Sequence, residues 1–168
     1  MLVLGIDPGY AIVGYGVLRY DRNSFMPIEF GAVTTKAKTE FTSRLETIYD
    51  GICDIIDRTK PEALAIEKLF FNTNTKTAID VAQARGVILL AAKKKNLPVF
   101  EYTPLQVKQA VTGYGKAPKA QVMDLTRRLL NLESVPKPDD TADALALAIC
   151  HCHSARSLIF KNMQGGIR

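Results

Sequence analysis

The chain has 168 residues, of which 47% are hydrophobic and 23% are charged, and these values indicate one globular domain rather than a disordered chain. Its formal net charge of +5 favours a polyanionic partner such as a nucleic acid. No apolar run reaches the roughly 18 residues that a membrane-spanning helix needs, no basic leader opens the chain, and three cysteines do not suggest a disulfide framework, so we expect a cytoplasmic protein without a membrane partner.

The first third of the chain has the pattern of an antiparallel meander of three strands. Residues 2–6 form a continuous apolar run, which is typical of a strand buried on both faces. The turn signal Pro8-Gly9 follows it. Residues 14–20 and 28–34 are two further strand-like runs, separated by a polar turn.

Helices and strands alternate in the rest of the chain. Apolar residues recur at three- and four-residue steps over residues 41–56, which predicts a helix. The elements expected after it are a strand at 63–66 that ends at Glu67, a helix at 77–95, a strand at 98–102, and helices at 104–111, 119–130 and 140–153. This order predicts an α/β fold with a five-stranded mixed sheet, in which two parallel strands join the meander and helices cover both faces.

No internal repeat, low-complexity tract or Pro/Gly-rich linker divides the chain. We therefore expect a single domain over residues 1–155. Residues 156–168 are basic and contain glycine near their end, which predicts a flexible tail.

Four acidic residues belong to elements that are expected to meet at one edge of the sheet. Asp7 and Glu67 each follow a strongly apolar strand, and ligand sites in such sheets lie at strand ends. Asp140 and Asp143 share one face of a predicted helix because they are three residues apart. The nearly wholly apolar helix beyond them would bury this first turn against the sheet. Each acid alone also has an ordinary explanation, as a turn residue, a solvated strand end or a helix cap.

Carboxylates that converge in this way repel one another and lose hydration unless a cation neutralises them. Oxygen-only ligands suit Mg²⁺ or Mn²⁺, and a pair of such ions about 3.5–4 Å apart forms the metal centre of many nucleases. The combination of an acidic spot and a basic chain predicts a metal-dependent enzyme that acts on nucleic acid.

Five short segments occur together in this chain: Gly5–Gly9, Ala65–Glu67, Gln83–Gly86, Gln106–Lys108 and Asp140–Ala146. In this order and spacing they resemble the RuvC family of bacterial Holliday-junction resolvases over essentially the whole chain. The resemblance implies a ribonuclease-H-like fold, a homodimer, and two Mg²⁺ ions per site that Mn²⁺ can replace. It implies resolution of four-way junction DNA in recombination and repair by paired nicks that leave 5′-phosphate and 3′-hydroxyl ends. The RuvA/RuvB branch-migration complex is a partner implied by the resemblance alone.

The resemblance also implies roles for individual residues. The catalytic, metal-binding acids of the family fall on Asp7, Glu67, Asp140 and Asp143. Asp139 adjoins Asp140 and is the alternative for the third of these acids. Lys108 and Lys119 match basic residues near the scissile phosphate, and Phe70 matches an aromatic residue that stacks on or between bases.

The residues themselves support these last roles less strongly. Phe70 and Phe71 are adjacent aromatics, of which one is usually buried in a core. Lys108 and Lys119 flank the basic, glycine-containing loop Gly113–Lys116. Most surface lysines are only solvated, but a basic, glycine-containing loop can follow a phosphate backbone. We therefore expect Lys116, in this loop, to bind DNA as well.

Three other interpretations stay open at this point. An actin-like sugar kinase or ATPase shares the Asp-x-Gly turn, but it needs a second phosphate loop and a second domain that 168 residues do not provide. A ribonuclease-H-like nuclease that acts on RNA would carry the same acids. A catalytically inactive junction-binding protein is the third interpretation, and the four intact acids argue against it.

Overall fold

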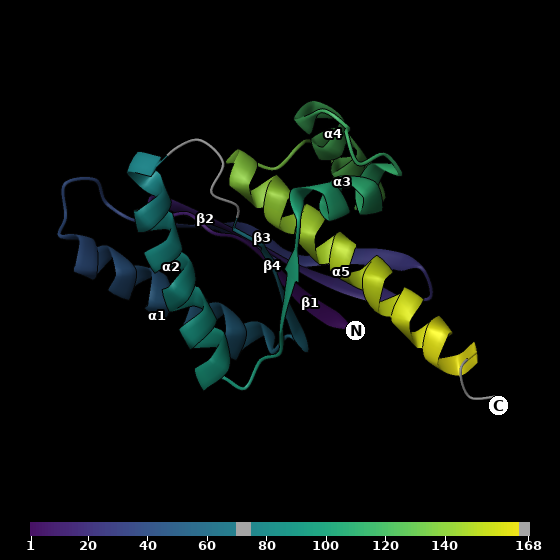
Figure 1. The fold of residues 1–168 in the computed structure, drawn as a ribbon, viewed down its shortest axis with the longest axis horizontal. Helices are drawn as coiled ribbons and strands as arrows, with labels where there is room; N and C mark the ends of the chain where they lie inside the picture. Colours follow the sequence, from purple (N-terminus) through teal and green to yellow (C-terminus); the bar gives the residue numbers. More distant parts are fainter. Residues whose placement is uncertain (70–74, 165–168) are drawn as a thin grey trace.

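The five strands form one mixed sheet in the order β3-β2-β1-β4-β5 (Figure 1). The antiparallel meander consists of β1 (Leu2–Asp7), β2 (Ile12–Asp21) and β3 (Ser24–Thr34). The two added strands, β4 (Ala63–Glu67) and β5 (Val99–Tyr102), run parallel to β1. The predicted sheet is therefore confirmed, with its meander and both parallel strands.

The computed structural model describes the backbone of residues 1–69 and 75–164, and the side chains of these residues except Thr75, Lys76 and residues 156–164. Phe70, the predicted base-stacking residue, lies outside the described residues. Within the described ranges, no helix combines the length and the apolar character that crossing a membrane requires.

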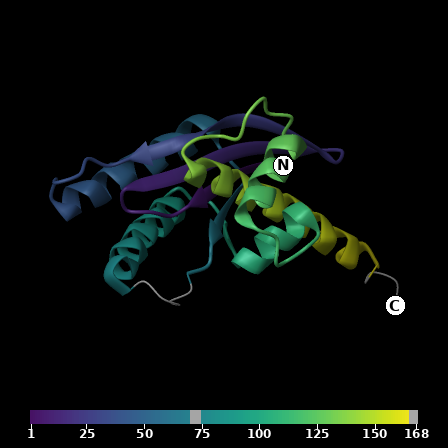
Figure 2. The ribbon, with the colours of Figure 1, turned by 90° about the horizontal axis from the view of Figure 1, so that it is seen from above.

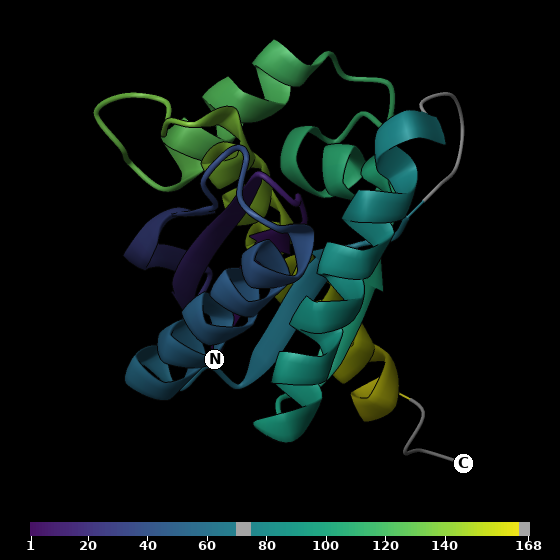
Figure 3. The ribbon, with the colours of Figure 1, turned by 90° about the vertical axis from the view of Figure 1, so that its left-hand side faces the viewer.

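Helices cover both faces of the sheet, as expected. On one face lie α1 (Phe41–Thr59) and α2 (Thr75–Lys94). On the other face α5 (Asp139–Gln164) crosses the strands, together with α3 (Pro104–Thr112) and α4 (Lys119–Leu129). Figure 2 shows the sheet between these layers, and Figure 3 shows α1 and α2 in front of the sheet with α5 behind it.

The last helix, α5, is longer than its apolar pattern predicts. We expected a helix at 140–153 and a tail at 156–168, whereas α5 begins at Asp139 and ends at Gln164. No glycine or proline lies between these two residues, so no residue in this range interrupts the helix. Residues 156–164 are therefore helical, which corrects the expected end of this helix at residue 153, while the flexibility expected of residues 156–168 stays a prediction.

Alternation along the strands decides which face each acid occupies. Val3 packs in the core under α5, and Leu4 packs in the core under α1 and α2. Because successive strand residues point to opposite faces, Asp7 lies on the α5 side, four residues after Val3. The same alternation places Glu67 on that side too, since it follows two residues after Ala65, which is in the core under α5.

Two glycines let α5 lie directly on the sheet. A Cβ atom at Gly5 would overlap the carbonyl oxygen of Ala144, and a Cβ atom at Gly14 would overlap the carbonyl oxygen of Asp140. Gly14 is also the partner of Asp7 across the β1–β2 ladder. The missing side chains therefore bring the first turn of α5 next to the end of β1.

Gly5→Ala should destabilise the fold, because the added methyl group meets helix backbone that cannot rotate away. Its Cβ would lie 2.9 Å from the backbone nitrogen of Ala148 as well, and we expect a loss of about 1–3 kcal/mol or more in the free energy of unfolding. Gly16→Ala is the control, because its Cβ would meet the Leu145 side chain, 2.7 Å from Cγ, which can change its rotamer. Urea unfolding of both variants measures the difference. Equal losses in the two variants would contradict this explanation.

Candidate functional site

Four acids gather where β1 and β4 end, beneath the first turn of α5. The two strands are parallel neighbours, and Ile6 lies opposite Ile66, so the acids that follow them are adjacent, as predicted. The acids are Asp7, Glu67, Asp140 and Asp143. The first two come from the sheet and the last two from the start of α5, so the site joins segments that are far apart in the sequence.

Asp7 lies at the centre of this group. Its pKa is raised to about 7, first by burial and then by the charges of Asp143, Glu67 and Asp140, while Lys119 lowers it. Burial and the charge of Asp143 also raise the pKa of Glu67, again against Lys119. Carboxylates that raise one another's pKa in this way are stabilised in their ionised form by a cation.

Lys119 supplies a positive charge at this place. Its Nζ atom lies 2.8 Å from Oδ2 of Asp143, and this hydrogen bond raises the pKa of Lys119, with burial opposing it. Lys119 is the first residue of α4, where the helix dipole disfavours a cation, so the acids explain its position better than the helix does. As the described side chains stand, no three acid, histidine or cysteine groups are close enough together to enclose a metal ion.

Asp139 and Asp140 have different charged neighbours. Asp139 accepts a hydrogen bond of 2.6 Å from Lys137, and its Oδ2 lies 3.9 Å from Nζ of Lys119. The contact with Lys137 is the first cause that lowers the pKa of Asp139. Asp140 instead contributes to the raised pKa of Asp7. Of the two neighbours, Asp140 therefore interacts with the acid cluster, and Asp139 interacts with the lysines.

A cavity of about 240 Å³ opens beside the acids. Its lining residues are Glu67, Pro104, Val107, Lys108, Lys119, Val122, Asp143 and Leu147. The structure thus brings Lys108 and Lys119 to the same cavity as two of the predicted acids. Lys116 is exposed and is not among the lining residues, so the structure does not bring it to the acids.

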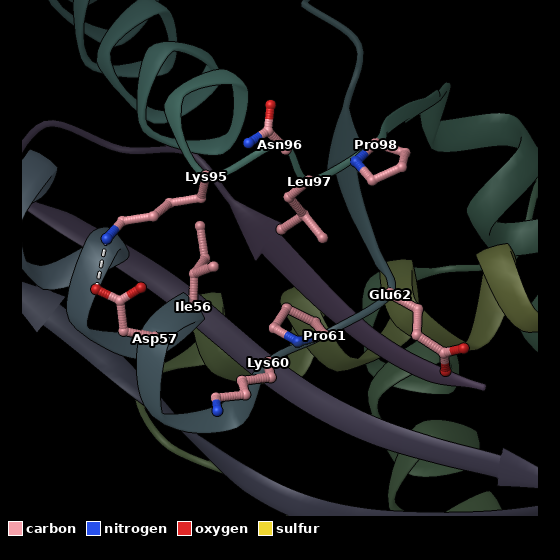
Figure 4. Close-up of a pocket in the computed structure, with 9 residues that line it drawn as sticks. All are labelled: Ile56, Asp57, Lys60, Pro61, Glu62, Lys95, Asn96, Leu97 and Pro98. Carbon is pink, nitrogen blue, oxygen red and sulfur yellow. Dashed lines mark hydrogen bonds and ion pairs between the residues drawn. The ribbon is translucent and has the colours of Figure 1, made fainter.

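A larger pocket, of about 490 Å³, lies at the other end of the sheet (Figure 4). Its walls include residues 60–62, which lead into β4, and residues 96–98, which lead into β5. It therefore opens at the amino ends of the parallel strands, whereas ligands of α/β sheets bind beyond the carboxyl ends. Two of its charged side chains, Lys95 and Asp57, neutralise each other at 2.5 Å. A choice of the candidate site by cavity size alone would therefore have fallen on the end of the sheet opposite to the acids.

Two residues that form hydrogen bonds to the backbone around the acids were not identified from the sequence. The buried Thr141 donates a hydrogen bond of 3.0 Å from Oγ1 to the carbonyl oxygen of Gly31, which ties the first turn of α5 to β3. Arg85 donates from Nε to the carbonyl oxygen of Glu67 at 3.2 Å. Both residues lie in segments that carry the family resemblance, and this position in the motifs was the only indication in the sequence that they could matter to the site.

Comparisons with known proteins agree with this arrangement. The family described as crossover junction endodeoxyribonuclease RuvC matches residues 3–151. The protein of that name from Caldanaerobacter subterraneus subsp. tengcongensis is 56% identical over 158 residues, which cover 94% of this chain and 96% of the relative. The Clostridioides difficile protein is 54% identical, with 98% of both chains covered.

A solved structure supports the same conclusion. The Thermus thermophilus RuvC structure in complex with a Holliday junction substrate matches with a TM-score of 0.88 at 36% identity, and the match covers 94% of this chain and 96% of the other. This likeness confirms the expected ribonuclease-H-like fold. The chain therefore belongs to the RuvC family of crossover junction endodeoxyribonucleases.

Proposed function

We propose that this protein is an endonuclease that resolves four-way (Holliday) DNA junctions in recombination and repair. The observation that carries the proposal is the gathering of four acids under α5 in a chain of the RuvC family. A relative from Thermus thermophilus has been solved on a Holliday junction, and the formal charge of +5 suits DNA. Family membership also leads us to propose the RuvA/RuvB branch-migration complex as a partner and the cytoplasm as the compartment.

The same acids are the residues that would hold divalent metal. Carboxylate oxygens are the donors that hard cations prefer, and the burial and neighbouring negative charges that raise the pKa of Asp7 favour a bound cation. The oxygen-only chemistry of these donors suits Mg²⁺, with Mn²⁺ as a substitute, and we propose two ions per site, which the side chains would move closer together to enclose. Asp7, Glu67, Asp140 and Asp143 would hold these ions. When bound, such ions supply Lewis-acid stabilisation of the phosphate charge and lower the pKa of water.

The lysines would bind and orient the scissile phosphate. Lys108 and Lys119 line the cavity beside the acids, where their charges would oppose the negative charge that grows on the phosphate in the transition state. The exposed Lys116 would contact the DNA backbone farther from the reaction. The products would be ends with a 5′-phosphate and a 3′-hydroxyl.

Paired nicks in a four-way junction require two sites related by a two-fold axis, so we propose a homodimer. The exposed face of α2 offers the surface. Ile79 and Leu90 are 64% and 52% exposed, and they lie on one face because their separation is close to a whole number of helical turns. Gly86 lies between them, and no heavy atom of the described residues lies within 4 Å of its Cβ position, which leaves room for a second helix.

Sedimentation should give about twice the chain mass of 18.5 kDa at micromolar protein. Leu90→Glu should shift the mass toward the monomer and remove paired nicking, because it places a charge in an apolar interface. Met26→Glu is the control, since Met26 is an apolar residue of similar exposure, 55%, on β3. A wild-type monomer that still makes paired nicks would contradict the symmetry argument.

Cleavage of a synthetic four-way junction, compared with a linear duplex of the same sequence, tests the proposed function. We expect nicks in the junction alone and only with a divalent metal. A junction that is bound but never cut, with Mg²⁺ or Mn²⁺, would indicate an inactive binding protein. Preferential cleavage of an RNA–DNA hybrid would indicate the RNA-directed alternative.

A further inference from the structure

Arg85 connects three elements directly below the acid cluster. It lies on α2, and its side chain is only 12% exposed. Its Nε atom donates to the carbonyl oxygen of Glu67 at 3.2 Å, and its guanidinium also forms an ion pair with Glu101 of β5. One side chain therefore ties the end of β4 to a helix and to the next strand.

The carbonyl group that Arg85 binds lies where β4 ends. Glu67 is the last residue of the strand and lies opposite Tyr102 of β5. The next amide, of Lys68, donates to the Tyr102 carbonyl oxygen at 2.8 Å, and the chain then leaves the sheet. Backbone groups at such an end need a partner outside the ladder, and Arg85 provides one for Glu67.

Arg85 reaches Glu67 from the face opposite to the acids. The carboxyl group of Glu67 points to the α5 side, where it lines the cavity with Asp143 and Lys119. Arg85 comes from α2, on the other side of the sheet. Arg85 thus contacts the backbone of Glu67 and not its carboxylate. It can therefore affect the carboxylate only by fixing the position of the backbone that carries it.

We propose that Arg85 is a positioning residue for Glu67, and that its bridge to the Glu67 carbonyl and to Glu101 holds the Glu67 carboxylate in place for a divalent ion. The proposal rests on the proposed function of the four acids. Groups that orient a metal ligand from behind influence both metal affinity and activity. Arginine suits this place because its planar fork can serve two acceptors at once.

Three variants test the proposal, and each is measured in three ways. The first measurement is the affinity of the protein for Mn²⁺ without DNA. The others are single-turnover junction cleavage across a Mn²⁺ titration, and junction affinity without divalent metal. Arg85→Gln should lower Mn²⁺ affinity and the cleavage rate by a factor on the order of 10 to 100 and leave junction affinity unchanged. Arg85→Lys should recover part of the loss. Glu101→Gln should have a smaller effect, since the bond to Glu67 remains.

Arg58 provides the matched control. It also bridges elements, from α1 to Glu29 of β3, with Asp54 as a further partner, and its partners do not include the four acids. Arg58→Gln should lower the melting temperature without changing Mn²⁺ affinity or the metal concentration that gives half the maximal rate. Amide hydrogen exchange at Lys68 should increase in Arg85→Gln alone, because that amide closes the same end of β4.

Several results would overturn the proposal. Arg85→Gln with wild-type Mn²⁺ affinity and rate would do so, and so would a loss of junction affinity with Mn²⁺ affinity intact, which would make Arg85 a DNA contact. An equal loss of Mn²⁺ affinity in Arg58→Gln would mean that both arginines affect metal binding only through the general stability of the fold. If Arg85→Gln does not fold, Arg85→Lys and Glu101→Gln decide by the same readouts. A wild-type protein that binds Mn²⁺ but cuts no junction would overturn the proposed substrate, and Mn²⁺ affinity alone would then decide the role of Arg85.

Discussion

Asp7→Asn should abolish junction cleavage and leave junction binding intact or stronger. Asparagine keeps the size of the side chain but removes the charge at the centre of the acid cluster, and it also removes a negative charge that would face a phosphate. Single-turnover cleavage and junction affinity should be measured on the same preparation. Asp139→Asn is the control, because Asp139 contacts Lys137 and Lys119, and it should still cut. Near wild-type cleavage by Asp7→Asn would refute the assignment of the site.

The same variant should stabilise the metal-free fold at neutral pH. The pKa of Asp7 is raised from 3.8 to about 7 in the folded state, so the native state binds this proton more tightly than the unfolded chain does. Stability contributed by Asp7 is therefore present below 3.8 and is lost as the pH rises toward and through 7. Asparagine does not ionise, so the stability advantage of Asp7→Asn should grow across this range and then level off.

Thermal unfolding with and without divalent metal measures this effect. Mg²⁺ should raise the melting temperature of the wild-type protein because it binds the folded state. It should raise that of Asp7→Asn much less. Equal stabilisation of both proteins by Mg²⁺ would mean that the ion binds somewhere other than Asp7.

Lys119→Ala should reduce the cleavage rate at saturating protein by a factor on the order of 10² with little change in junction affinity. Lys119 bonds Asp143 at 2.8 Å and lines the cavity with Glu67, so its charge lies where the reacting phosphate would be. Lys108→Ala should show the same pattern, since Lys108 lines the same cavity. Single-turnover cleavage across a protein titration separates the rate from the affinity.

Lys116→Ala is the matched control for this pair. Lys116 is exposed and does not line the cavity. Its loss should weaken binding and lower the salt dependence of affinity by about one ion, with the saturated rate unchanged. Full saturated rates in Lys119→Ala and Lys108→Ala as well would place all three lysines on the binding surface and leave the chemistry to the acids and metal.

Hydrophobic patterns and motif spacing were enough to predict the order of the elements and to single out the candidate acids. Apolar runs and helical periodicity located all five strands and all five helices of the described chain, because each element buries a face whose period is visible in the chain. The expectation that Asp7 and Glu67 are adjacent depended on β1 and β4 being neighbours, which the sheet order confirms. The predicted end of α5 at residue 153 was wrong, because the strongly apolar run ends there, whereas no glycine or proline interrupts the helix before Gln164.

The packing around the acids, and the different charged neighbours of Asp139 and Asp140, could not be predicted from the sequence. Asp139 and Asp140 are the same residue type at adjacent positions, so only the packing of α5 could show that Asp140 interacts with Asp7. That packing depends on backbone contact at Gly5 and Gly14, which no side-chain pattern encodes. The bond from Arg85 joins residues 18 positions apart across two elements, and such pairings exist only after long-range packing has brought their backbones together.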